Sequence, residues 1–328
     1  IMKKYIKHII IAFISFLLIV ILNFLLPRLL PGNPIGYLTG LNEEGMSAEK
    51  YAFYYHALHL DENILSQFRY YLIDIFNGTL GYSYKKEATI SSLIFSKIGV
   101  SLQITFPAAF FSILIGILWG VESGYKKNGF FDNFSTILLL TLNTIPLFAI
   151  ALILIILFCF NLNIFPYYGI SSGNYSPGSI EFFFDRLYHL VLPILTIIIG
   201  SFPSKYLLLR NITAQFVDNK CVLYAKQCGL SNSKIKFSYI LKNISQPVIA
   251  MIGTTIGNCF VGSIIVENIF SINGVGGLLN DGINTLDYPL IQGILFVTTL
   301  FMVICVMISD ILCLLVDPKL RKEKENEN

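Results

Sequence analysis

The chain has 328 residues, of which 55% are hydrophobic and 13% are charged, and its mean hydropathy is +0.68. A typical soluble domain has about 25% charged residues. This composition therefore excludes disordered, collagen-like and disulfide-scaffold classes and argues against a soluble enzyme. The class that remains is a protein that crosses a bilayer several times.

Apolar segments long enough to cross the roughly 30 Å hydrocarbon core as helices occur six times. They are 9–26, 98–121, 135–158, 187–209, 247–266 and 290–316. The first follows two lysines, as in a secretory signal, but its length predicts a retained helix. Membrane helices tolerate interior prolines when neighbours satisfy the freed backbone groups, so we expect the spans to include Pro107, Pro146, Pro193 and Pro203.

The distribution of charge predicts that both termini lie inside. With this topology, the inner side holds 16 of the 23 basic residues and 7 of the 20 acidic ones, a net charge of +9. The outer side holds 7 basic and 12 acidic residues, a net charge of −5. This asymmetry follows the positive-inside rule. Lys205 is near the end of the fourth span, where its charge can snorkel to the membrane surface.

Outside the spans, a long polar outer segment is expected to be helical. Ser47 can cap a helix over 48–58, and helical spacing of apolar residues predicts a second helix over 64–76, which Gly78 ends. The apolar face of the second helix lies on the membrane interface, packs on the outer ends of the spans, or forms a small core of its own. The sequence leaves these alternatives open.

The inner segment 210–246 is basic and has a helix–turn–helix pattern. A helix is expected over 218–228, Gly229 fits a left-handed turn, and Ser231 can cap the next helix, which ends before Pro247. Attraction of the lysines to anionic lipid explains the charge alone. The length and the pattern indicate a docking element as well.

Sequence motifs for chemistry are lacking. The chain has no G-x-x-x-x-G-K-[ST], G-x-S-x-G or H-E-x-x-H, which excludes a P-loop ATPase and gives no catalytic residues. His56 and His59 have no evident third ligand, so we expect no metal site. None of the six cysteines falls in the long polar stretches, so an outer disulfide framework is not expected.

Several spaced blocks resemble a known family. The chain reads VENIFSINGVGGLLNDGINTLDYPLIQG over 266–293 and ISDILCLLVDPKLR over 308–321. It also has LPGNP at 30–34, GTLGYS at 78–83 and AKQCGLS at 225–231. This pattern resembles the permeases of the oligopeptide/dipeptide/nickel family of ABC importers, and most closely the first of the two permeases. The signature positions are Asp287, Tyr288, Pro289, Asp310, Asp317 and Pro318.

The resemblance implies an all-α type I importer permease with six spans. It divides the chain into a tail and first helix (1–30), an outer helical insertion (31–97), a five-helix core (98–321) containing the coupling loop 210–246, and a charged inner tail (322–328). It also implies a multi-pass protein of the inner membrane of a prokaryote.

The implied partners are a paralogous second permease, two cytoplasmic ATPases and an external binding protein, besides membrane lipid; no nucleic acid is implied. ATP and Mg would bind the ATPases, and this chain would hold no cofactor. The implied ATPase-coupling residues are Tyr224, Ala225, Lys226, Gly229, Leu230, Ser231 and Lys234, with Ala225 permitting close approach. The expected outer-mouth residues are Glu267, which can brace a turn through backbone N–H groups, and Asn273, Gly274, Gly276 and Gly277.

Some positions depart from the family pattern, and the substrate stays open. Leu223 stands where a Glu leads the general importer motif, 226–228 reads KQC instead of the usual Arg-Ala-Lys, and Asn273 replaces the usual Pro. Peptide is the family default, and nickel or a metal chelate is the alternative. A stand-alone secondary transporter would show intramembrane charges or inverted repeats, and a membrane enzyme would show clustered acids or histidines.

Overall fold

The computed structural model describes residues 2–29, 35–36 and 47–316. Most of these residues are helical. In chain order the longer elements are α1 (Met2–Leu29), α3 (Ala48–Ala57), α4 (Ile64–Phe76), α5 (Ile90–Tyr125), α6 (Phe130–Thr144), α7 (Leu147–Ile155), α8 (Ile180–Phe216), α9 (Lys220–Gln227), α12 (Ser245–Gly257), α13 (Cys259–Ile269), α14 (Val275–Thr285) and α15 (Tyr288–Val316). The short elements are strands β1 (Tyr82–Ser83) and β2 (Ala88–Thr89), π-helices η1 (Ile156–Asn161) and η2 (Ile235–Ile240), and helices α10 (Asn232–Lys234) and α11 (Leu241–Asn243).

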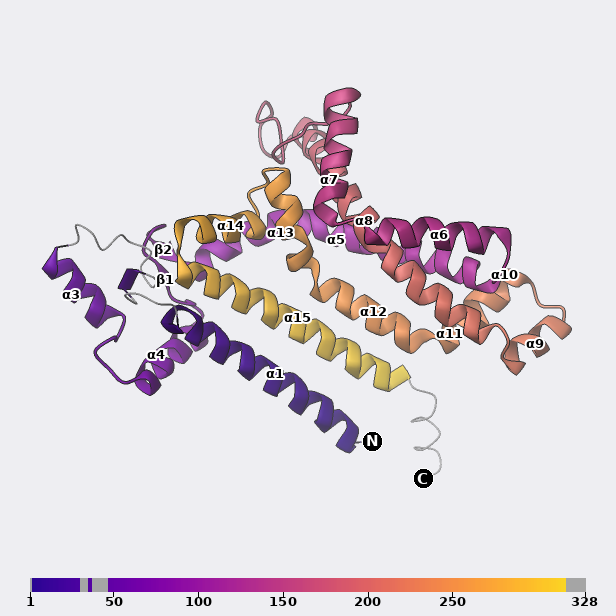
Figure 1. The fold of residues 1–328 in the computed structure, drawn as a ribbon, viewed down its shortest axis with the longest axis horizontal. Helices are drawn as coiled ribbons and strands as arrows, with labels where there is room; N and C mark the ends of the chain where they lie inside the picture. The colour runs from indigo at the N-terminus through magenta and orange to yellow at the C-terminus, as the bar shows by residue number, and fades with distance from the viewer. Residues whose placement is uncertain (1, 30–34, 37–46, 317–328) are drawn as a thin grey trace.

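The long helices form an elongated bundle (Figure 1). The start of α1, the end of α15 and the short elements α9 to α11 lie toward one end, whereas α3, α4 and the β1–β2 ribbon lie at the other. Within the described residues, α5, α8 and α15 are each long and apolar enough to cross a membrane. Two bent helix pairs raise the number of candidate spans to five, and α1 adds a shorter apolar stretch, Phe13–Leu25.

The third expected span is not one continuous helix. α6 and the α7–η1 segment meet at an angle of 96°. Ile145, just before Pro146, has extended backbone (φ −79°, ψ 123°), because proline disfavours the helical region for the residue that precedes it. The expectation that Pro146 lies inside a span helix is therefore wrong. Pro107 lies inside α5, as expected.

A smaller bend divides the fifth expected span. α12 and α13 meet at 46° around Asn258. In α8, by contrast, Pro193 and Pro203 are accommodated within one helix of 37 residues. The bend at Asn258 brings the end of one helix and the start of another to the same depth in the bundle.

A row of glycines on α5 allows a close contact with α8. A methyl group at Gly120 would lie 2.9 Å from Leu209 Cβ, and one at Gly124 would lie 2.5 Å from the Arg210 carbonyl oxygen. Glycines spaced four apart let helix backbones approach closely in membranes. This contact fixes α8 against α5 along the half of the bundle that carries α9 to α11. We call this half inner and the opposite half outer, after the topology predicted from the sequence.

The outer helices form as expected. Ser47 caps α3 and Asn63 caps α4 through side-chain oxygens. Phe68 of α4 contacts Phe24 of α1, with ring centroids 5.0 Å apart, and Arg28 Nε donates to the side-chain oxygen of Gln67 at 2.9 Å. The apolar face of α4 thus packs on the outer end of the first helix.

This packing also buries a tyrosine of α4. Burial raises the pKa of Tyr71 to about 12, against the opposing influence of Arg28, so the phenol stays protonated at neutral pH.

The β1–β2 ribbon and α14 were not expected from the sequence. Two-residue strands leave too little alternation to recognise.

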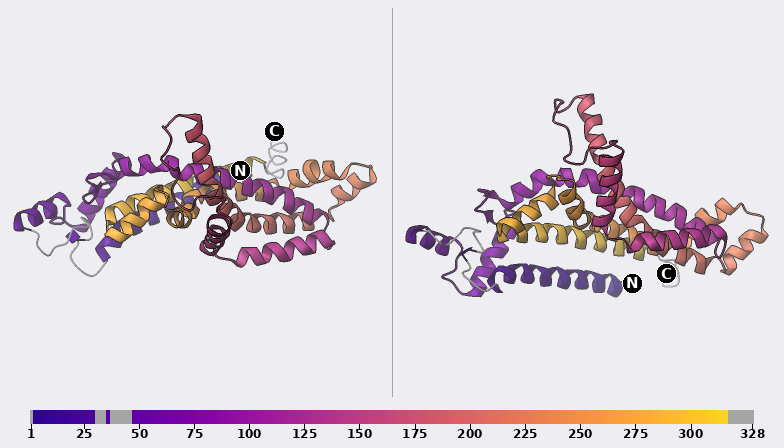
Figure 2. Two further views of the ribbon diagram at one scale, coloured as in Figure 1. Left: turned by 90° about the horizontal axis from the view of Figure 1, so that it is seen from above. Right: turned by 45° about the horizontal axis from the view of Figure 1, so that its top comes forward.

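One part of the molecule stands out from the bundle. The loop after η1 and the first turns of α8 project from it in both views of Figure 2. The described residues of α7, η1 and early α8 include large apolar side chains that are more than half exposed: Phe148, Ile153, Phe160, Phe183 and Phe184. This projecting hairpin has an apolar surface without a cover in the isolated chain.

Candidate functional site

The inner end of the bundle carries a compact helix–turn–helix, residues 218–243, which we call the coupling element. Its first helix, α9, begins after Asn219, whose side-chain oxygen accepts from the Cys221 N–H. Gly229 follows with a φ of +71°, the left-handed conformation expected from the sequence. Ser231 caps the next helix by accepting from the Lys234 N–H at 3.4 Å. The predicted turn and the first predicted helix are confirmed. The second predicted helix ends before Pro247 as expected, but it consists of α10, the π-helix η2 and α11 instead of one α-helix.

One face of the coupling element is anchored on the bundle. Val222 and Ala225 of α9 pack with Ile235 and Ile240 of η2, in a buried cluster with Leu209 of α8. Ala225 is only 5% exposed. Its small side chain therefore permits close approach of α9 to η2 and α8 within the chain.

The opposite face of the coupling element is exposed. Tyr224 is 64% exposed, and Leu230 is half-buried in the same cluster as Ala225. The other residues named for coupling are exposed: Lys226, Gly229, Ser231 and Lys234. One face of the element is anchored on the bundle, and the opposite face is exposed, polar and basic. This arrangement suits the element to contact another protein.

Polar contacts tie the end of α5 to the coupling element. The Tyr125 hydroxyl donates to the side-chain oxygen of Asn232 at 2.8 Å, and Lys226 Nζ lies 5.1 Å above the Tyr125 ring. Lys236 of η2 forms an ion pair with Glu122, which also pairs with Lys126 at 2.7 Å. These contacts connect the coupling element directly to the end of α5.

A buried ion pair holds α6 to α8, and the sequence did not reveal it. Asp132 is fully buried, and one of its oxygens accepts from Arg210 Nε at 2.8 Å. The same carboxylate accepts from the hydroxyl of Ser123 at 2.6 Å and the N–H of Asn128 at 2.9 Å. Asp132 and Arg210 are 78 positions apart, so no local pattern could pair them.

At the outer half of the bundle, a buried carboxylate braces the turn between α13 and α14. Glu267 is fully buried, and its Oε2 accepts from the N–H of Gly276 at 2.7 Å and of Gly277 at 3.2 Å. Ser101 of α5 accepts from the N–H of Val275 at 2.8 Å. The predicted bracing of the turn by Glu267 is confirmed, and the turn is tied to α5.

The glycines of this turn are required by space. A methyl group at Gly276 would lie 2.5 Å from Ile264 Cα, and one at Gly274 would strike the Glu267 carboxylate. Gly274 and Gly276 are buried and Gly277 is half-buried, whereas Asn273 is exposed. Of the outer-mouth residues, Asn273 is therefore the one with a freely accessible side chain, and the others build the turn.

The signature residues serve the start of α15. Asp287 is buried and caps this helix by accepting from the Leu290 N–H at 3.2 Å, while the Ser83 hydroxyl of β1 donates to its other oxygen. Tyr288 and Pro289 form the first turn of α15. Asp310 is half-buried near the inner end of that helix. Asp317 and Pro318 lie outside the described residues.

Comparison with known proteins decides the family. Residues 112–322 match the family described as binding-protein-dependent transport system inner membrane component. The chain belongs to this family of ABC importer permeases. The permease is 29% identical to the dipeptide transport system permease protein DppB of Bacillus subtilis over 312 residues, which cover 95% of each chain.

Further relatives have similar lengths. DppB of Escherichia coli K12 is 27% identical over 330 aligned positions, covering 94% of the permease and 96% of the relative. The nickel import system permease protein NikB of Staphylococcus aureus is 27% identical over 305 positions, covering 93% and 88%. Relatives named for dipeptide and for nickel transport therefore resemble the permease about equally well.

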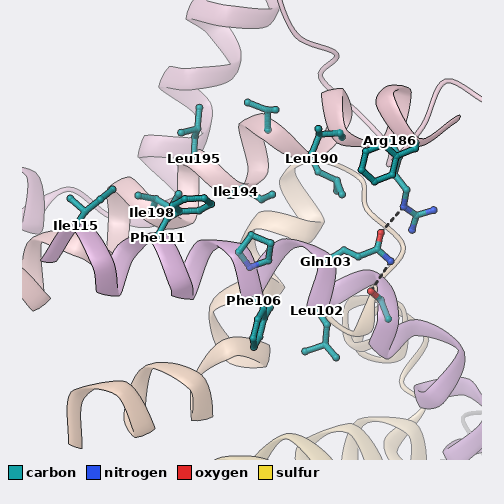
Figure 3. A pocket seen from close by; sticks show the side chains of 15 residues that line it. Leu102, Gln103, Phe106, Phe111, Ile115, Arg186, Leu190, Ile194, Leu195 and Ile198 are labelled. Carbon is teal, nitrogen blue, oxygen red and sulfur yellow. Dashed lines mark hydrogen bonds between the residues drawn. The ribbon is translucent and has the colours of Figure 1, made fainter. Parts of the chain in front are cut away.

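The permease has a large apolar groove between the outer halves of α5 and α8, with a volume of about 950 Å³ (Figure 3). Phe106 and Phe111 of α5 and Leu195 of α8 are among its lining residues. Its main polar feature is Arg186 Nε, which donates to the side-chain oxygen of Gln103 at 2.6 Å. Such a groove suits apolar side chains or lipid tails better than a hydrated ligand.

The position of Lys205 differs from the expectation. Lys205 is only 7% exposed, and its Nζ donates at 3.0 Å to the carbonyl oxygen of Ser201, one turn earlier in α8. The side chain is thus directed away from the inner end of the helix. The expectation that Lys205 snorkels to the inner membrane surface is therefore wrong, because the lysine is enclosed by α5, α8 and the bent α12–α13 pair.

Proposed function

We propose that the permease is one half of the translocation pathway of an ATP-driven, binding-protein-dependent importer of short peptides. It crosses the membrane six times with both termini inside. It pairs with a paralogous second permease, docks two cytoplasmic ATPases, and receives substrate from an external binding protein. The family membership and the likeness to dipeptide permeases support this proposal.

The observation that carries the proposal is the coupling element. Its cluster of buried side chains fixes it to α8 and α12, while Tyr224, Lys226 and Lys234 remain exposed. The positive φ of Gly229 sets the angle between α9 and the following helix. An exposed, basic projection that is anchored on the inner end of the bundle is suited to bind a separate ATPase.

The long helix α5 connects the coupling element to the turn between α13 and α14. Its inner end is bound to the coupling element through Tyr125 and Glu122, and its outer half is bound to the α13–α14 turn through Ser101. Closure of the ATPases would pull the coupling element, tilt α5 and shift the outer turn. Such rigid-body movement of packed helices is a common way to alternate access.

The projecting hairpin of α7, η1 and early α8 is proposed to contact the second permease. Its exposed phenylalanines form an apolar surface that a second permease can cover. The apolar groove between α5 and α8 extends this surface. Together these features support a heteromeric channel over a transporter that acts alone.

Import of nickel, free or chelated, is the second candidate, because NikB resembles the permease as closely as DppB does. Both candidates use the same machinery and predict the same ATPase partners. They differ in the cargo that crosses between the helices, which uptake measurements can determine.

The test is purification of the tagged permease from cells that also produce the proteins encoded beside it. We expect two ATPases and a second permease to elute with it. In proteoliposomes with ATP inside and the binding protein outside, radiolabelled Ala-Ala should accumulate only when ATP is hydrolysable. A permease that purifies alone and transports without ATP would refute the proposal. Uptake of nickel but not of Ala-Ala would show that nickel, and not a peptide, is the substrate.

The topology has its own test. In a variant without native cysteines, Asn63→Cys should react with an impermeant maleimide in intact cells, whereas Asn232→Cys should react only after lysis. Both positions are exposed at opposite ends of the bundle. The reverse pattern would refute the orientation with both termini inside.

A further inference from the structure

A second, smaller cavity lies deep in the bundle, where α5, α8 and the α12–α13 bend meet. Its volume is about 400 Å³. In contrast to the apolar groove of Figure 3, this cavity has many polar side chains. They include Thr105 and Ser112 of α5, Ser201, Ser204 and Lys205 of α8, Thr255 of α12, and Asn258 at the bend.

Lys205 is the one charged residue that lines this cavity in the described part of the chain. Its Nζ has three N–H donors, and the hydrogen bond recorded for it uses one of them, to the Ser201 carbonyl. None of the lining residues is acidic, and no ion pair among the described residues includes Lys205. A buried cation normally requires an anionic partner, because its desolvation is costly.

The surroundings of Lys205 are built to keep it in place. A methyl group at Gly116 of α5 would lie 2.8 Å from Lys205 Cβ, so α5 is in direct contact with the base of the side chain. The low exposure of Lys205 and the hydrogen bond from its Nζ to the Ser201 carbonyl place the amine beside the cavity.

Further groups around the cavity are suited to an anion. Ser201 Oγ is buried and has no hydrogen-bond partner, so its hydroxyl is available as a donor. The hydroxyls of Thr105, Ser112 and Thr255 donate to carbonyls of their own helices, so their oxygens can accept from N–H groups of a ligand but do not donate to its carboxylate.

We propose that this cavity holds the carboxylate of the transported substrate, with Lys205 Nζ as its charged partner and Ser201 Oγ as a neutral donor. This inference rests on the proposed function, since it assigns the cavity to the translocation route. A carboxylate can come from the C-terminus of a peptide or from the organic ligand of a metal chelate. A free hydrated divalent cation is the wrong charge for this site.

The charge of the cavity can be measured without a known substrate. Ser204 lines the cavity and is exposed to it, so Ser204→Cys introduces a reporter thiol there. The native cysteines are replaced first, because Cys259 lines the same space. Membranes that contain the full-length permease with its co-produced partners are treated with two methanethiosulfonates of similar size, one with a sulfonate and one with a trimethylammonium group.

The measured quantity is the ratio of the two reaction rates, anionic over cationic. One buried charge at this range changes such a ratio by about tenfold or more. Lys205→Met should lower the ratio by that factor, Lys205→Arg should preserve it, and Lys50→Met on the exposed outer helix α3 should leave it unchanged. An unchanged ratio in Lys205→Met, or a thiol that reacts with neither reagent, would overturn the proposal.

Protection of the reporter thiol then distinguishes the sources of the carboxylate. Millimolar Ala-Ala, Ala-Ala amide and nickel citrate are compared as protectants. Slower labelling with Ala-Ala but not with its amide assigns a peptide terminus, and slower labelling with nickel citrate alone assigns a chelate. Protection by none of them, or equal protection by Ala-Ala and its amide, would overturn the proposal. The labelling needs no ATP, so its failure leaves the importer assignment intact, and failed ATP-dependent uptake leaves the labelling result interpretable.

Discussion

Glu267→Ala removes the carboxylate that braces the α13–α14 turn. The N–H groups of Gly276 and Gly277 both donate to Glu267 Oε2, in a region where the carboxylate is fully buried. A buried donor left without a partner costs about 1–3 kcal/mol. The two donors together predict a loss of about 2–6 kcal/mol. At an unfolding entropy of about 2.1 cal/mol/K per residue, this lowers the melting temperature of a chain of 328 residues by about 3–9 °C.

The assay is thermal unfolding of the purified permease complex in detergent, combined with uptake into proteoliposomes. Glu267→Gln is the informative companion, because its amide oxygen can still accept both N–H groups. The other carboxylate oxygen of Glu267 has no hydrogen-bond partner among the described residues, so the amide nitrogen displaces no contact. We expect Glu267→Gln to retain more than half of the stability that Glu267→Ala loses.

Glu181→Ala is the matched control on the outer side. Glu181 is exposed in the first turn of α8, where an acidic residue contributes less than about 1 kcal/mol. Equal melting temperatures for Glu267→Ala and Glu181→Ala would refute the bracing role. A glutamine variant as unstable as the alanine variant would show that the negative charge is needed, and not the acceptor.

The coupling element and the buried ion pair give two further predictions. Gly229→Val strains the left-handed turn by about 1–2 kcal/mol, so the permease should reach the membrane at normal levels but lose substrate-stimulated ATP hydrolysis. Gly173→Val places the same strain in an equally open outer loop (φ +75°) and should hydrolyse ATP normally, so equal rates in both variants would contradict the coupling role. Arg210→Met leaves the buried Asp132 carboxylate without its half-buried partner and should cost about 3 kcal/mol in thermal unfolding, whereas adding Asp132→Asn should recover much of it; additive losses would contradict the pairing.

Features that depend on neighbouring residues could be predicted from the sequence. A glycine after a short helix and a serine before the next one fix the turn at Gly229 and Ser231, because both act through their own backbone and the next turn. The bracing role of Glu267 could also be predicted, since its partners Gly276 and Gly277 follow only nine and ten positions later.

Features that depend on distant contacts could not be predicted. The burial of Ala225 against η2 and the ion pair of Asp132 with Arg210 appear only once the helices are packed. The break at Pro146 was underestimated, because a proline in an apolar run is compatible with both a kink and a break. For Lys205, distance from the inner end suggested snorkelling, but the cavity beside α5 that holds its amine is a tertiary feature.

The central claim is that the exposed face of the coupling element contacts an ATPase. The most direct measurement is photo-cross-linking in the assembled complex, with p-benzoylphenylalanine in place of Tyr224 or, as control, Phe53. Both side chains are 64% exposed, and they lie at opposite ends of the bundle. We predict that the probe at Tyr224 cross-links to an ATPase subunit and the probe at Phe53 does not. Absence of an ATPase cross-link from Tyr224, or one of equal yield from Phe53, would contradict the account.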